Sequence, residues 1–330
     1  MLANSLQILK ALQYSNGLFA AARKDVKTGY NRAWIRDNVY SVLGFEAVGN
    51  FEEVKKTLHA LLDILKKHEY KIDWMIKQPL PKHSYRYIHA RYDPITNEEI
   101  HEQWGNKQND SIGALLFKIG DLERRGINII RDEDKNIIQK LVDYLQAIEY
   151  WHDKDNGMWE ENEEVHASSI GACVAGLKKI KDIVNVPQEL IEKGEEALNN
   201  LLPRESLTKE VDLALLSLIY PYNIITEEQR EQILENVEEQ LLRERGVIRY
   251  KGDRYYYFNG EAEWTFGLAW LSIIYKQINN VTKQKFFLEK TLRCVNIFGE
   301  LPELYFANTS KHNDNFPLAW AQSLMIVAMA

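Results

Sequence analysis

The links between helical segments alternate between short and long along the whole chain, and this alternation limits the folds open to it. Apolar residues recur with a helical period and strand-like alternation is almost absent, which predicts an all-α protein. Thr226, Asp132 and Pro187 are residue types that favour helix starts. The expected helices span residues 2–13, 37–48, 51–68, 109–125, 132–150, 163–183, 187–201, 208–220, 226–243, 261–277, 281–296 and 315–329.

The short links follow every second helix, at residues 49–50, 125–131, 185–186, 221–225 and 279–280. The long links are rich in aromatic and charged residues and contain the segments AWIRDN, HARYD with QWGNKQND, NGMWEEN, PRESLTKEVD, RYKGDRYYYFNGE and GELPELYF. If six helical hairpins close into a ring, every long link lies on one face, at the N-terminal ends of the inner helices. The pattern thus predicts one polar, aromatic face.

The helices that follow the long links have the sequences expected of a crowded inner ring. ASSIGACVAG is rich in small residues, and DLALLSLIY is almost wholly apolar. Together these features predict an (α/α)6 barrel that forms a single domain over residues 1–330. An irregular helical solenoid would also alternate, but it would not need its polar motifs in every second loop.

Composition excludes several classes of partner. The formal net charge is -7 with mixed charges, which argues against nucleic acid, because phosphate binding needs clustered Lys and Arg. No window reaches the roughly 20 apolar residues that span a membrane, and the N-terminus lacks the basic start of a signal peptide. Cys173 and Cys294 lie in apolar helical contexts, as small buried residues in a reducing compartment do. We therefore expect a cytoplasmic protein, with its oligomeric state open.

The residues gathered on the polar face suit a sugar. Aromatic rings stack on the C–H faces of a sugar, while charged and amide groups pair with its hydroxyls. The sequence has no Gly-rich nest or lysine cluster for a phosphate, and its eight scattered histidines lack metal-ligand spacing, so we expect neither a phosphate site nor a metal. The predicted substrate-binding residues are Trp34, Arg36, Asp37, Trp104, Gln108, Asp110, Trp159, Glu161, Arg249 and Tyr250.

Two carboxyl groups fit the needs of glycoside hydrolysis, which takes one protonated and one ionised acid beside the same bond. Glu160 follows Trp159, and a carboxyl held against an aromatic ring keeps its proton more readily, so Glu160 fits the acid. Glu303 precedes the last inner helix and fits the base. The plainer alternatives are that Glu160 helps to cap a helix and that Glu303 is an exposed loop acid.

The other motifs also have two interpretations. Asp37 could be a helix cap beside a structural arginine, or Arg36 and Asp37 could grip neighbouring sugar hydroxyls. The segment 108–110 could likewise be a cap or a set of hydroxyl partners. In the glutamate run 160–164, a cap at Asn162 would put the last two glutamates in the first turn of the next helix, as structural residues.

These motifs resemble those of the glucoamylase family, glycoside hydrolase family 15, and of the related part of the phosphorylase kinase α and β subunits. The resemblance runs from about residue 17 to 330 and includes five motifs in the family's order. They are AWIRDN at 33–38, WGNKQND at 104–110, GMWEENEEVHASSIG at 157–171, VIRYKGD with YYYFNG at 247–260, and LPELYF with NFPLAWAQS at 301–323.

The resemblance implies an (α/α)6 barrel and an inverting, exo-acting hydrolase of small α-glucosides that needs no cofactor. It implies that Glu160 is the acid, that Glu303 is the base and that Arg36, Asp37 and Arg249 bind sugar. An inverting enzyme needs its two carboxyls roughly 6.5–9.5 Å apart. Maltose-type, isomaltose-type and trehalose-type linkages all stay open.

This chain also departs from the family. There is no room for the N-terminal β-sandwich domain of bacterial glucoamylases. The base segment reads P-E-L instead of the more usual E-E or E-Q, which puts the role of Glu303 in doubt. Residues 203–218 and 166–171 look closest to phosphorylase kinase α. The alternative function is therefore a non-catalytic, carbohydrate-binding regulatory protein.

Overall fold

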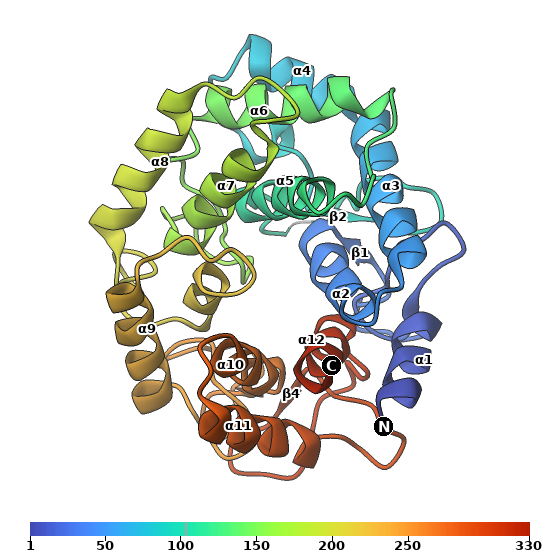
Figure 1. Ribbon diagram of the computed structural model, residues 1–330, viewed down its shortest axis with the longest axis vertical. Helices are drawn as coiled ribbons and strands as arrows, with labels where there is room; N and C mark the ends of the chain where they lie inside the picture. The colour runs from blue at the N-terminus through green and yellow to red at the C-terminus, as the bar shows by residue number, and fades with distance from the viewer. Residues whose placement is uncertain (103) are drawn as a thin grey trace.

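The computed structural model describes residues 1–102 and 104–330 and has the form of a double ring of helices (Figure 1). The outer ring contains α1 (Leu2–Leu12), α3 (Phe51–Lys67), α4 (Glu69–Lys77), α6 (Asp134–Ile148), α8 (Gln188–Leu201), α9 (Glu227–Gln240) and α11 (Val281–Arg293). The inner ring contains α2 (Ile35–Ala47), α5 (Asn109–Arg124), α7 (Ala167–Ile180), the 3-10 helix η2 (Leu213–Leu218), α10 (Phe266–Gln277) and α12 (Ala319–Met329).

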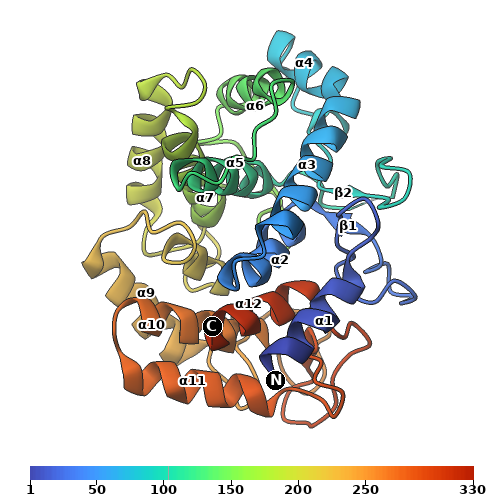
Figure 2. The same cartoon turned by 45° about the vertical axis from the view of Figure 1, so that its right-hand side comes forward.

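The inner elements contact one another in chain order and close into a ring. α2 contacts α5, α5 contacts α7, and the sequence continues through η2, α10 and α12, which packs back on α2. Figure 2 shows α1 beside α12, so that helices from the two ends of the chain complete the barrel. The predicted (α/α)6 barrel is confirmed.

Burial separates the two rings as the sequence predicts. In α2 every residue from Ile35 to Phe45 is buried, whereas α9 buries only Ile233, Leu234 and Val237. An inner helix is surrounded by neighbours, and an outer helix needs only one apolar stripe. Thr226 and Gln229 form a reciprocal capping box at the start of α9, which confirms that helix start.

The contact between α5 and α7 depends on glycine. Gly113 of α5 packs against the backbone of Ala172 and Cys173 in α7, and Gly176 of α7 packs against the carbonyl oxygen of Gly113. A Cβ atom at Gly113 would overlap main-chain atoms that have no rotamer to relieve the clash. The small residues in the ASSIGACVAG segment therefore let two inner helices touch through their backbones.

Gly113→Ala is expected to lower the free energy of unfolding by about 1–3 kcal/mol, the usual cost of overpacking a filled interior. Alanine favours helix by itself, so any loss comes from the contact with α7. Urea denaturation monitored by circular dichroism measures the effect. The control is Glu196→Ala on the exposed face of α8, which should change stability by less than about 0.5 kcal/mol. Equal stability of the two variants would contradict the predicted contact.

One expected helix and one expected loop need correction. The segment predicted as a helix over residues 208–220 is the 3-10 helix Leu213–Leu218, which begins where the side chain of Asp212 accepts from the amide of Ala214. An apolar run buried on all sides has no periodicity that separates a 3-10 helix from an α-helix. Helix α4 was expected to be part of a long loop, although Ile72 and Met75 bury a helical stripe there.

The run of glutamates also differs from prediction. Helix α7 begins at Ala167, so Asn162 does not cap it and Glu163 and Glu164 lie outside its first turn. The cause is a bridge between the backbones of Asp155 and Glu164, which holds the residues between them as a closed loop.

Two further features that the sequence analysis considered are the cysteines and membrane-spanning segments. Cys173 and Cys294 are buried and form no disulfide, as predicted. Within the described residues, no helix has both the length and the apolar character needed to cross a bilayer.

Candidate active site

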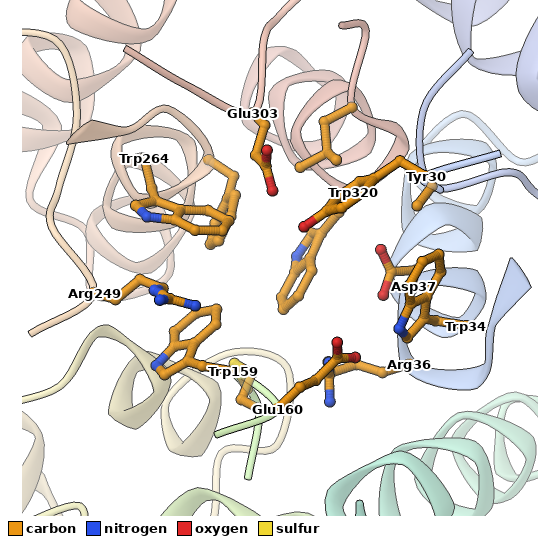
Figure 3. Close-up of a pocket in the computed structure, with 14 residues that line it drawn as sticks. Tyr30, Trp34, Arg36, Asp37, Trp159, Glu160, Arg249, Trp264, Glu303 and Trp320 are labelled. Carbon is orange, nitrogen blue, oxygen red and sulfur yellow. The ribbon is translucent and has the colours of Figure 1, made fainter. Parts of the chain in front are cut away.

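A pocket opens at the centre of the barrel, where the inner elements have their N-terminal ends (Figure 3). Its walls include seven residues that the sequence singles out: Trp34, Arg36, Asp37, Trp159, Glu160, Arg249 and Glu303. An adjoining outer compartment shares Tyr30, Trp159, Glu160 and Arg249 with this pocket and adds Trp104 and Glu161. The structure therefore brings residues from four separated segments to one cavity.

Arg36 anchors one wall through buried ion pairs. Its Nη1 donates to Asp110 Oδ2 at 3.0 Å and to Gln108 Oε1 at 2.9 Å, and its Nη2 lies 3.4 Å from Glu160 Oε1. Burial lowers the pKa of Arg36, but the nearby carboxylates of Asp110, Glu160 and Asp37 outweigh it and raise the pKa above its usual value. Gln108 and Asp110 thus lie behind the wall and hold the guanidinium at the cavity.

Asp37 lies in the first turn of α2 and directs its carboxyl into the pocket (Figure 3). Trp34 holds the cap position, so the alternative of an N-cap aspartate is wrong. Burial raises the pKa of Asp37 to about 7, although Arg36 lowers it. The same carboxyl can therefore accept from a sugar hydroxyl when ionised and donate to one when protonated.

Asp37→Asn is expected to change how stability depends on pH. Between about pH 4 and pH 7 the native carboxyl holds a proton that the unfolded chain has lost, so the free energy of unfolding falls as pH rises through this window. Asparagine removes this contribution. The stability of the wild type relative to the variant should fall by about 1–3 kcal/mol between pH 5 and pH 7.5, as measured by urea denaturation.

The matched control for that experiment is Asp25→Asn, because the Asp25 side chain is 83% exposed. Its stability relative to the wild type should stay constant over the same pH range. A constant difference for Asp37→Asn as well would contradict a buried carboxyl with a raised pKa.

Glu303 is fully buried on the opposite wall from Glu160 (Figure 3). Its Oε2 accepts from Asn315 Nδ2 at 2.8 Å and also from Asn313 Nδ2. Its Oε1 has no hydrogen-bond partner among the residues that the structure describes. Burial raises the pKa of Glu303, against the lowering effect of Asn315 and Asn313. The alternative of an exposed loop acid is therefore wrong.

Glu160 stands at the end of a tight turn with a φ of 62°, in the left-handed region that non-glycine residues seldom adopt. Its Oε1 accepts from Gln108 Nε2 at 2.9 Å, and its Oε2 accepts from Trp104 Nε1. It does not cap α7, which starts seven residues later. The strained backbone places its carboxyl between the inner and outer compartments.

Glu161 does not line the central pocket, and both of its carboxylate oxygens accept hydrogen bonds. It accepts from Arg249 Nη2 at 2.9 Å, from Tyr250 Oη at 2.8 Å and from Lys209 Nζ at 2.6 Å. Tyr250 therefore lines a separate depression beside Lys209, and it does not line the central pocket. Asp253 completes the support of Arg249 with a bidentate ion pair.

Sequence reasoning missed several residues of the pocket. Tyr30 and Tyr255 join across the mouth through a 2.7 Å contact between their hydroxyls. Trp320 and Phe266 form a stacked floor, with ring centroids 4.8 Å apart. Asp212 holds Trp159 in place by accepting from its Nε1 at 2.7 Å. Trp264 and Trp320 lie near the starts of inner helices, so the rule that identified the other residues could have found them.

Within the described part of the chain, no group of three or more His, Cys, Asp and Glu side chains is arranged to hold a metal ion. The site is built instead from three carboxyls, two guanidiniums and aromatic walls. This set of groups can bind a single polyhydroxylated ring.

The barrel thus holds Glu160 and Glu303 on opposite walls of one aromatic pocket (Figure 3). The sequence matches the family described as "Glycosyl hydrolases family 15" over residues 1–329, and the chain belongs to this family. A structure described as wild-type glycosidase superposes with a TM-score of 0.84 at 18% identity, covering 99% of this chain and 96% of the other. A bacterial glucoamylase complexed with acarbose gives 0.73 at 17% identity, covering 99% and 54%. Both share the fold.

Among curated proteins, the phosphorylase b kinase regulatory subunit alpha of Oryctolagus cuniculus skeletal muscle is similar to this chain. The two are 27% identical over 372 residues, which is 89% of this chain and 30% of that protein. The chain thus spans less than a third of this relative's length.

Proposed function

We propose that this chain is an inverting, exo-acting hydrolase that releases β-glucose from the non-reducing end of small α-gluco-oligosaccharides of the maltose or isomaltose type. The family supports glycoside hydrolysis in general. The arginine and aspartate side chains support a sugar with many hydroxyl groups.

The observation that carries the proposal is the state of Glu303. One of its oxygens is held by two asparagine amides, and the other, free oxygen belongs to a carboxyl on the wall opposite Glu160 (Figure 3). A buried carboxylate with one free oxygen is suited to take a proton from water.

In the proposed mechanism, Glu160 donates a proton to the glycosidic oxygen as the bond from C1 breaks. Glu303 takes a proton from a water molecule that attacks C1 from the opposite face. The attack inverts the configuration at C1, and the products are β-glucose and a shortened saccharide. Arg36, Asp37 and Arg249 bind the hydroxyls of the terminal glucose.

The test is to incubate the chain with maltose, isomaltose and trehalose and to follow the released anomer by proton NMR. Initial release of β-glucose from maltose or isomaltose is the expected result. Initial release of α-glucose would contradict inversion, and cleavage of trehalose alone would contradict the substrate class.

The second candidate is a non-catalytic, carbohydrate-binding regulatory protein. It is favoured by the similarity to a regulatory subunit over 89% of this chain. Calorimetric binding of maltose without turnover of any of the three disaccharides would support it over the hydrolase.

A further inference from the structure

The loop that carries Glu160 is closed at its base. The backbones of Asp155 and Glu164 exchange two hydrogen bonds of 2.9 Å, so the loop leaves and returns at one point. Within it, the amide of Glu160 donates to the carbonyl of Gly157 at 3.3 Å, and both residues have φ near +60°. The position of Glu160 therefore follows the position of Gly157.

The imidazole of His166 lies directly against Gly157. A Cβ atom on Gly157 would come within 2.8 Å of both Cδ2 and Nε2 of this ring. His166 is only 3% exposed, so the ring is enclosed between the loop and the start of α7. Any movement of the ring would be passed to the turn that ends at Glu160.

Two buried carboxyls accompany the ring. His166 Nδ1 lies 3.2 Å from Glu205 Oε1, and Glu205 Oε2 accepts from the amide of Ser168 at 3.1 Å, in the first turn of α7. Asp155 Oδ1 accepts from the amide of Gly157, and its Oδ2 accepts from the amide of Asn109 at 2.9 Å, at the start of α5. The carboxyls thereby tie the loop to two inner helices.

The carboxyls of Glu205 and Asp155 favour the charged form of the ring. Burial lowers the pKa of His166, but Glu205 and Asp155 outweigh burial and raise the pKa to about 9. A charged imidazole has donors on both nitrogens, and Nδ1 lies 3.2 Å from Glu205 Oε1, although neither ring nitrogen forms a hydrogen bond within the described residues. A neutral side chain of similar size would lose this attraction.

We propose that His166 is a positioning residue whose ring, packed against Gly157 and beside Glu205, fixes this turn and so aims Glu160 at the oxygen of the leaving group. The inference rests on the proposed function, because it needs Glu160 to be the acid. Small displacements of a catalytic group cost up to about 100-fold in rate. A change at His166 should therefore lower the rate only for substrates whose leaving group needs a proton from Glu160.

The test compares maltose, whose leaving group needs a proton, with α-glucosyl fluoride, whose fluoride leaves without one. His166→Gln should lower kcat on maltose about 10- to 100-fold and change KM less than about threefold. It should keep activity on α-glucosyl fluoride within about threefold of wild type, which also shows that the variant folds. Glu205→Gln removes the partner of the ring and should give the same selective loss.

The matched control is His59→Gln, a partly buried histidine whose Nε2 contacts the carbonyl of Ile129 in the outer ring at 2.7 Å. It should leave both rates unchanged. Equal losses on the two substrates, or no loss in His166→Gln, would overturn the positioning role. If the wild type cleaves neither substrate, the proposed function itself fails, which is a separate result.

Discussion

Glu303→Gln is expected to lower kcat about 10²- to 10⁴-fold, the range in which a positioned base contributes. Asn313 and Asn315 both donate to Oε2, so the new amide must place its oxygen there and turn its NH₂ group toward the free position. An NH₂ group cannot accept a proton from water. The loss should therefore be similar on maltose and on α-glucosyl fluoride, because both reactions need activated water.

The control for this variant is Glu289→Gln on the exposed face of α11, where the side chain is 68% exposed. It should leave kcat and KM unchanged. Steady-state kinetics on both substrates, with circular dichroism to verify folding, measure the effect. A folded Glu303→Gln variant with wild-type kcat would refute the assignment of the base.

Glu160→Gln is expected to lower kcat on maltose by about 10²- to 10⁴-fold but to leave most of the activity on α-glucosyl fluoride. Glutamine fills the same space and its oxygen can still accept from Gln108 and Arg36, although its NH₂ group cannot accept from Trp104 Nε1. What it cannot do is protonate the glycosidic oxygen. The difference between the two substrates isolates that step.

Glu163→Gln provides a control from the same loop, because Glu163 pairs with Lys107 outside the pocket. Its kcat on maltose should stay within about twofold of wild type. Wild-type kcat for Glu160→Gln on maltose would show that the acid lies elsewhere. An equal loss on maltose and fluoride would assign Glu160 to substrate binding instead of proton donation.

Sequence reasoning performed best where a local pattern has a direct spatial consequence. The alternation of link lengths and the small-residue segment of α7 predicted which helices form the inner ring. Small side chains suit a helix that is surrounded by neighbours. The same pattern predicted that Arg36, Glu160 and Glu303 would gather on one face, and they line one cavity.

It performed worst where the outcome depends on partners distant in the chain. Tyr250 was predicted to bind substrate, but its hydroxyl is taken by Glu161, 89 residues away. Trp320 lines the pocket, and only its place near the start of the last inner helix indicates this in the sequence. No local periodicity reveals either contact.

The glutamate run at residues 160–164 shows what the sequence determines and what only the tertiary structure determines. By itself the sequence determined that a cluster of carboxyls follows a tryptophan at the mouth of an all-α barrel. Only the tertiary structure decided that Glu160 faces the pocket, that Glu161 supports Arg249 and that Glu163 and Glu164 lie outside α7. The physical reason is that adjacent side chains point in directions set by the backbone, and here the closure of the ring brings His166 against Gly157 and Arg249 to Glu161.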